Sequence, residues 1–478
     1  MLQNIQLEMS LKPFRQVDDA SIDAVCRGVF EQWKPLVKNV PTVSIMLWAA
    51  DGCEILDYKA NMDEAFEWAK WVGGPNRGGN ERRAHPEWDP NGIGLHTRAY
   101  LYMKDPPVMT YGVLKKIVAA FRRVGKEVLG EDKHILVGDT FDTGYEFAKS
   151  PFRYERHPEI LYSDHTWKNT FLCSYAKLHA DDVPYAGYPN GIPEGLPFGT
   201  FFGRQAEHFL RDLGFDFIWF SNGLGFTREY WTTVGPVFNG ERFIPEAMDF
   251  VQKSALEFWD LFTAECSFPI ETRGTNMTMG IDMATDAVPL GAIYKKNPTM
   301  LPPPNSPWAA LNGDYGLEIA GYLSRIAELP AQRYLFRYYL HDPWWANSPW
   351  YDRYNGMPHD IYLPLACARI DENGKVQPPT DLSFLTIDNS FGEMPDSCVN
   401  EPIPHLLKGR TPPMPLRRLC GCIRLQNTTP PPRCNSSMTC SPRIGTFATR
   451  STTACRCPPL RRPPHFASRI CRFIAAVC

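Results

Sequence analysis

The sequence of 478 residues lacks the features that would mark a membrane, secreted or nucleic-acid-binding protein. No apolar run approaches the ~20 residues that a membrane-spanning helix needs. The first residues do not have the basic-then-apolar order of a signal peptide. A net charge of −3 argues against nucleic acid as the main partner. We therefore expect a cytoplasmic globular protein with neither a membrane nor a nucleic acid as partner, and the sequence leaves its oligomeric state open.

The catalytic motifs of several large enzyme classes are also missing. No G-x-S-x-G is present, which disfavours the serine hydrolases. Neither an H-x-H after the first predicted strand nor an H-E-x-x-H occurs, so a metal-dependent hydrolase barrel is only a less favoured alternative. No glycine-rich phosphate-binding turn follows the first predicted strand. We therefore predict no metal and no organic cofactor.

The C-terminal part of the chain lacks lysine and acidic residues altogether. From Arg410 onward there are 12 Arg, 8 of the 14 Cys and 11 of the 44 Pro. Residues 1–409 thus carry a net charge of −15 and residues 410–478 carry +12, which together give the −3 of the whole chain. The six Cys before Arg410 have no paired spacing, which is typical of a reducing compartment.

We interpret residues 410–478 as a frame-shifted, disordered tail. A zinc module would need a C-x2-C ligand set, which is missing, and a basic disordered tail normally mixes Lys with Arg and has few Cys. Translation of GC-rich DNA in a shifted frame gives Arg, Pro, Cys, Ser and Thr without acids. Codons for Leu419–Arg424, read from their third bases, permit a strand-like fragment such as Val-Trp-Val-Tyr-Pro.

Residues 1–409 alternate short apolar runs with helical segments, a pattern that predicts an α/β fold with a parallel sheet. The predicted strands are 4–9, 42–48, 134–137, 215–220, 268–271, 334–340 and 383–388. The predicted helices are 21–36, 111–129, 203–213, 245–266 and 314–329, with a further start at 401–407. Seven such units fit a (β/α)8 TIM-type barrel that lacks its last strand because of the C-terminal frameshift. A doubly wound sheet is the alternative.

Loss of a barrel strand would leave the edges of the first and seventh strands unpaired. We therefore expect impaired folding of the chain as written.

Acidic side chains stand at the carboxyl ends of several predicted strands, which form the mouth of a barrel's active site. The catalytic candidates are Glu271, Asp342, Asp139 and Asp388. Glu271 lies directly at a strand end, and Arg273 two residues later would keep it ionised, as a nucleophile needs. The same two residues would equally serve as an ion pair that braces the rim. An acid at a strand end is also a common helix cap or turn former.

Aromatic, amide and charged side chains at the same strand ends are suited to a sugar. Trp offers a face to the C–H groups of a sugar ring, whereas Asn, Arg and Asp bind its hydroxyls. The predicted substrate-binding residues are Trp48, Asp51, Asp142, Glu146, Asn222, Arg273, His341 and Trp345.

With this layout, residues 1–409 resemble the (β/α)8 glycoside hydrolases. The resemblance rests on the order of elements and on the segments IETRGTN around Glu271, FDFIWFSNGLGF and HDPWW. It is at the level of the superfamily, because Ser221-Asn222-Gly223 stands where many retaining β-glycosidases carry an Asn-Glu pair. The resemblance implies a glycan substrate and two acidic catalytic residues. A catalytically silent carbohydrate-binding barrel is the alternative from another class.

Overall fold

The computed structural model of the chain describes most of its first 385 residues. The described residues are 2–72, 100–142, 150–162, 171–221, 242, 244–272, 289–301, 304–305, 315–327, 329, 333–340, 368–371, 373–385, 387, 403–404 and 406–407. The chain divides into two compact units, Met1–Met414 and Pro415–Cys478. The tail 410–478 lies outside the described residues, so the fold is that of the first unit.

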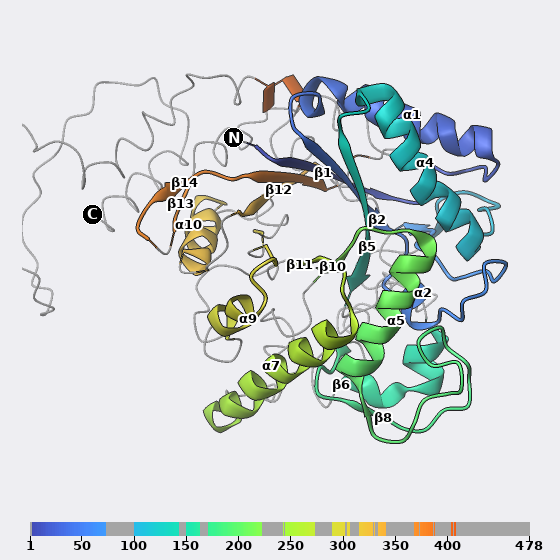
Figure 1. Cartoon of the computed structure of the whole chain (residues 1–478), viewed down its shortest axis with the longest axis vertical. Helices are drawn as coiled ribbons and strands as arrows, with labels where there is room; N and C mark the ends of the chain where they lie inside the picture. The colour runs from blue at the N-terminus through green and yellow to red at the C-terminus, as the bar shows by residue number, and fades with distance from the viewer. Residues whose placement is uncertain are drawn as a thin grey trace, which may run out of the picture. The chain divides into compact units, whose positions relative to one another are not determined.

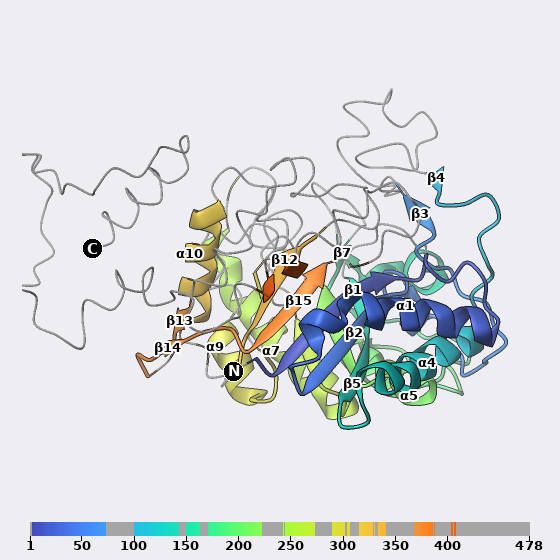
Figure 2. The same ribbon diagram turned by 90° about the horizontal axis from the view of Figure 1, so that it is seen from above.

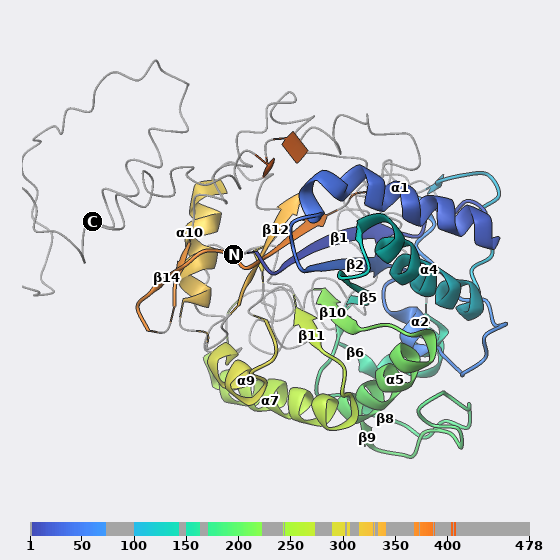
Figure 3. The same cartoon turned by 45° about the horizontal axis from the view of Figure 1, so that its top comes forward.

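A seven-stranded parallel sheet forms the centre of this unit (Figure 1). In the order in which they pair, its strands are β11 (Ile270–Thr272), β10 (Phe217–Ser221), β5 (His134–Asp142), β2 (Thr42–Trp48), β1 (Asn4–Ser10), β15 (Asp381–Leu385) and β12 (Leu335–Tyr339). All six pairings are parallel. The sheet is curled into an incomplete barrel with helices along its outside (Figure 3). The predicted α/β class with a parallel sheet is confirmed.

The outer layer consists of the helices that the apolar periodicity predicts, with one addition. They are α1 (Asp19–Val37), α4 (Tyr111–Leu129), α5 (Phe198–Leu213), α7 (Met248–Glu265), α10 (Tyr315–Ile326) and the unpredicted α9 (Leu290–Lys296). Side-chain oxygens of Asp18 and Thr110 accept backbone N–H groups and begin α1 and α4. Gly214, at a φ of +84°, ends α5. In the part of the chain that the structure describes, no helix is both long and apolar enough to cross a bilayer.

Short elements occupy the loops of the barrel. They are the helices α2 (Cys53–Leu56), η2 (Phe152–Arg156), η3 (Pro158–Ile160) and η4 (Pro245–Ala247), and four two-stranded ladders: β3–β4 (Trp71–Val72, Tyr100–Leu101), β6–β7 (Leu161–Tyr162, Phe171–Leu172), β8–β9 (Lys177–Leu178, Leu196–Pro197) and β13–β14 (Arg369–Ile370, Val376–Gln377). Several of them follow β5, in the long loop between β5 and α5.

Aromatic side chains fill the layer between the sheet and the helices. Phe141 of β5 and Phe220 of β10 both contact Phe202 of α5, at ring-centroid distances of 4.2 and 5.6 Å.

Gly138 leaves room for the ring of Phe217, which would lie 2.1 Å from a Cβ at that position. Because Gly138 fits here, β5 continues to Asp142 and pairs with β10, five residues beyond the predicted end of the strand.

The first and last described strands of the sheet, β1 and β15, pair directly with each other (Figure 2). β1 lies beside β15 from Asn4 opposite Asp381 to Leu7 opposite Phe384. The expectation that the first and seventh strands have unpaired edges is therefore wrong. In an eight-stranded barrel the last strand closes on the first, so β15 takes the last position and β12 the position before it.

Among the described residues, the open interval of the barrel lies between the edge strands β11 and β12, which do not pair with each other. Asn305, which is buried there, accepts the backbone N–H of Arg337 and donates to its carbonyl, both at 2.8 Å. On the other side, Tyr294 of α9 donates to the carbonyl of Leu301 at 2.6 Å and lies 3.2 Å from the hydroxyl of Thr272 on β11. An amide side chain thus takes the place of a peptide group at the edge of β12.

Candidate active site on the inner face of the barrel

The inner face of the barrel is identified by side chains that meet across the curl of the sheet. Gln6 of β1 contacts Glu271 of β11, and Glu8 of β1 contacts Arg337 of β12, although β1 pairs with neither strand. Successive residues of a strand point to opposite faces. Phe141 of β5 packs against α5, so its neighbours Thr140 and Asp142 belong to the inner face.

Glu8 is the centre of a buried polar network on this face. Its carboxylate accepts hydrogen bonds from Nε of Arg337 at 2.5 Å, from Ser383 Oγ of β15 at 2.6 Å and from Trp48 Nε1 of β2 at 3.1 Å, and from a second guanidinium nitrogen of Arg337. The guanidinium carbon lies 5.3 Å from the ring centroid of Trp219 on β10. Because its partners come from three strands and both charges are fully buried, this pair joins strands across the inner face.

Glu271 is the predicted catalytic residue that the structure places on the inner face, as the middle residue of the three-residue strand β11. Gln6 Nε2 donates to its Oε2 at 2.6 Å. Burial, only partly offset by the hydrogen bond from Gln6, raises the pKa of Glu271 to about 7, and the charges of Asp381 and Glu8 add to the increase. A carboxyl group with this pKa is suited to donate a proton at neutral pH, rather than to stay ionised as a nucleophile.

Asp139 lies on the opposite face of the sheet from Glu271. The sequence places it in a loop after the third strand, but it falls inside β5 and is paired in register with Ile218 of β10. Its carboxyl group meets that of Glu54 of α2, and both residues are fully buried. Burial is the main cause that raises the pKa of Asp139 to about 8 and that of Glu54 well above its usual range. Both carboxyl groups, which lie between the sheet and the helices, therefore hold their protons to a higher pH than an exposed carboxyl group does.

Asp51 and Asp142 lie at the carboxyl ends of adjacent strands, β2 and β5, and are joined by a residue that no sequence pattern predicted. Nη2 of Arg153 donates to the backbone carbonyls of Asp51 and Asp142, at 3.2 and 3.0 Å. Arg153 is fully buried in η2, and its guanidinium carbon lies 5.7 Å from the ring centroid of Phe141. A lone Arg in a loop gives no pattern in the sequence, so only the fold identifies this contact.

The remaining predicted site residues lie outside the described residues. These are the catalytic candidates Asp342 and Asp388 and the substrate-binding candidates Glu146, Asn222, Arg273, His341 and Trp345. The structure therefore brings together Glu271 and Trp48 on the inner face, and Asp51 and Asp142 at the ends of β2 and β5.

Comparison with known proteins gives only distant similarities. No protein-family model and no curated protein matches the sequence. Among solved structures, the chain is similar to one described as an alpha amylase from Salmonella typhimurium, with 10% identity and a TM-score of 0.34 over 80% of this chain. The chain spans about 55% of the length of that protein.

Two further structures are carbohydrate-active enzymes. One contains the GH20 catalytic modules of the pneumococcal exo-β-D-N-acetylglucosaminidase StrH, with 10% identity over 85% of this chain and 84% of that chain, and a TM-score of 0.33. The other is AmyP in complex with maltose, with 9% identity over 85% and 78%, and a TM-score of 0.33. These neighbours belong to the glycoside hydrolases, the group that the sequence resembles. All three TM-scores are below 0.5. The curl of the sheet is shown by the pairing of its own strands.

Proposed function

We propose that this protein is a glycoside hydrolase in which Glu271 is the general acid. The observation that carries the proposal is the position of Glu271 on the inner face, one residue before the last residue of β11, together with its pKa of about 7. Hydrolysis of a glycosidic bond needs one carboxyl group that is protonated at working pH. Glu271 would give its proton to the glycosidic oxygen as the bond from that oxygen to the anomeric carbon breaks.

The second carboxylate must be ionised, and Asp142 supports this part of the proposal best among the described residues. It stands at the carboxyl end of β5 and belongs to the inner face by the alternation of the strand. Asp342 and Asp388, which follow two further predicted strands, are proposed as the other candidates. This carboxylate would add to the anomeric carbon at a separation of about 5 Å from Glu271, or deprotonate a water at about 6.5–9.5 Å.

Carbohydrate is the substrate class that we propose for the mouth of the barrel. Trp48 supports this proposal, since it is the last residue of β2, at the carboxyl end of the strand, and its indole N–H is held by Glu8. Asp51, Asp142, Glu146, Asn222, Arg273, His341 and Trp345 complete the proposed substrate-binding set.

The test is a screen of aryl and alkyl glycosides with the full chain and two variants. Glu271→Gln keeps the shape of the side chain but removes the acid, and Glu257→Gln changes an exposed residue of α7 as the matched control. We expect Glu271→Gln to lower kcat/KM by about 10²- to 10⁴-fold on alkyl glycosides. The loss should be much smaller on dinitrophenyl glycosides, whose leaving groups need no proton.

Two outcomes would overturn the proposal. Equal losses of kcat/KM on alkyl and dinitrophenyl glycosides would show that Glu271 is not the general acid. Retained binding of oligosaccharides with no turnover of any glycoside would identify the protein as a non-catalytic carbohydrate-binding barrel.

A further inference from the structure

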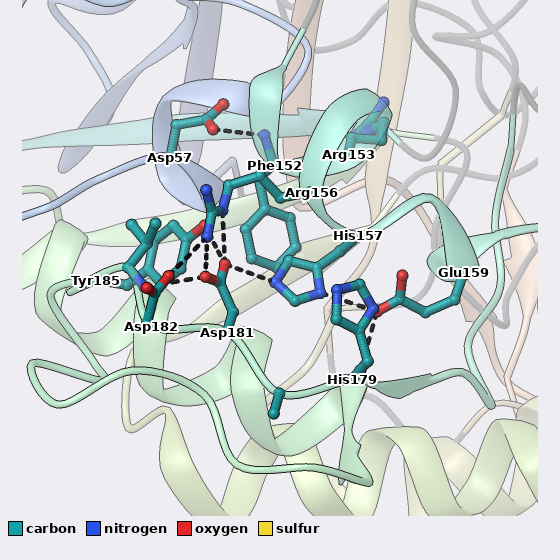
Figure 4. A network of polar contacts seen from close by, with 12 residues as sticks. Asp57, Phe152, Arg153, Arg156, His157, Glu159, His179, Asp181, Asp182 and Tyr185 are labelled. Carbon is teal, nitrogen blue, oxygen red and sulfur yellow. Dashed lines mark hydrogen bonds and ion pairs between the residues drawn. The ribbon is translucent and has the colours of Figure 1, made fainter.

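Two histidines and a glutamate converge in the long loop between β5 and α5, away from the inner face (Figure 4). His157 precedes η3, Glu159 lies within it, and His179 follows β8. Oε1 of Glu159 lies 2.8 Å from Nδ1 of His157 and 2.9 Å from Nδ1 of His179. The ligand-type atoms of the three residues all lie within 4.8 Å of one another.

Asp181 fixes the orientation of His157 from the other side of its ring. Its Oδ2 lies 3.1 Å from Nε2 of His157 and accepts the hydroxyl of Tyr185 at 3.0 Å, and the carboxylate forms a two-point ion pair with Arg156. The backbone N–H of Val183 also donates to this carboxylate, at 2.9 Å. Because the carboxylate of Asp181 is paired with a guanidinium and accepts hydrogen bonds, Nε2 of His157 is the ring nitrogen that donates to it.

This orientation leaves Nδ1 of His157 turned toward a second carboxylate. In the neutral ring, Nδ1 has a lone pair, and a lone pair 2.8 Å from a carboxylate oxygen is repulsive unless a cation lies between them. His157 is fully buried and stacks on Phe152 at a centroid distance of 4.4 Å, which prevents the ring from turning away. The same oxygen of Glu159 also faces His179.

We propose that His157, Glu159 and His179 bind a divalent cation of the zinc class. Two imidazole nitrogens and one carboxylate oxygen are a donor set typical of zinc, whereas magnesium and calcium prefer oxygen ligands only. At metal–ligand distances of about 2.0–2.1 Å, tetrahedral ligands are separated by roughly 3.3 Å. Small side-chain rotations that widen the present 2.8 and 2.9 Å separations would admit the ion. Asp181 then serves as the hydrogen-bonded carboxylate that commonly supports a metal-bound histidine.

One coordination position of this ion would be open to solvent. His179 is half exposed and lines a pocket of about 630 Å³ together with Glu155, Arg156, Asp182 and Asn190. Three protein ligands and an accessible fourth position are typical of zinc sites that hold a water or another small ligand. The ion would also join η3 to the segment after β8, and so stabilise the loop. The sequence predicted no metal because the ligands form an H-x-E with a distant His, which matches none of the common metal-binding motifs.

The experiment measures zinc bound to the full chain by equilibrium dialysis against zinc chloride. The variants are His179→Ala and Glu159→Gln, and the control is His208→Gln, an exposed histidine of α5. The chain has 14 cysteines, and thiolates can also bind zinc. The measurement therefore compares the number of zinc ions bound per chain between the variants. We expect both site variants to lose one equivalent of zinc and the control to lose none. Zinc should raise the Tm of the wild type and of the control more than that of His179→Ala.

Cobalt replaces zinc in a second measurement that separates the site from thiols. The equivalent lost in His179→Ala should contribute cobalt absorption without the sulfur-to-metal charge-transfer band of thiolate ligation. Equal zinc stoichiometry in all four proteins would overturn the proposal, and so would loss of a thiolate-ligated equivalent. His157 would then bridge Glu159 and Asp181 as a doubly protonated ring, without a metal.

Discussion

The ion pair between Glu8 and Arg337 makes a specific prediction about the stability of the barrel. Arg337→Met removes both hydrogen bonds of the guanidinium to Glu8 and its position over Trp219, but roughly keeps the side-chain volume. Both charges are fully buried, so solvent does not screen the loss. Breaking one partner of a buried pair costs about 3–5 kcal/mol, because the other charge is left uncompensated.

The hydrogen bonds that remain place the expected cost at the lower end of this range. Ser383 and Trp48 continue to donate to Glu8 in the variant. Among the described residues, Nη1 of Arg337 has no hydrogen-bond partner, so its removal also relieves an unsatisfied donor. We therefore expect a loss of about 3 kcal/mol in the free energy of unfolding, or roughly a hundredfold in the unfolding equilibrium.

Urea unfolding followed by tryptophan fluorescence measures this loss as a lower midpoint at an unchanged slope. The matched control is Arg123→Met, which removes an exposed arginine of α4 from Asp23 and Glu127 and should cost about 0–1 kcal/mol. Adding Glu8→Gln to Arg337→Met should recover part of the loss, because no buried charge is then left. A loss equal to that of the control, or no recovery in the double variant, would refute this account of the buried Glu8–Arg337 pair.

Three further predictions concern the edge of β12 and two buried carboxyl groups. Asn305→Ala should lower the free energy of unfolding by about 1–3 kcal/mol in urea titrations, since it leaves the N–H and the carbonyl of Arg337 unpaired. Burial raises the pKa of Asp139 to about 8, so the folded state keeps a proton that the unfolded chain loses near pH 4. Stability should therefore fall as the pH rises from about 4 to about 8 and level off above that, and thermal melts of Asp139→Asn should show a flatter dependence. The kcat/KM of the wild type should fall above about pH 7 as Glu271 loses its proton, and Glu271→Gln should lack this limb. A pH profile with no change near 7 would contradict the assignment.

Part of the candidate site followed from the sequence, because acids at strand ends are visible as a pattern. Glu271 was predicted at a strand end and lies on the inner face, next to Gln6. Asp139 was predicted with it, but pairs with Glu54 on the other face. A polar residue and a glycine end an apolar run without ending the strand, so the sequence could not show that β5 continues through Asp139. Arg153 gave no pattern, because one of its contacts, Asp51, is distant in the chain. His157, Glu159 and His179 gave none either, because their spacing matches no common metal-binding motif.

The order of strands and helices in residues 1–409 was determined by the sequence itself. Period-two and period-3.6 apolar patterns act within a few residues, so β2 and α4 were predicted to the residue. Only the tertiary structure decided how the barrel closes, with β15 rather than a missing strand beside β1, and with Asn305 at the open interval. Strand pairing and the face that each side chain adopts depend on contacts between distant segments, and local patterns do not encode these contacts.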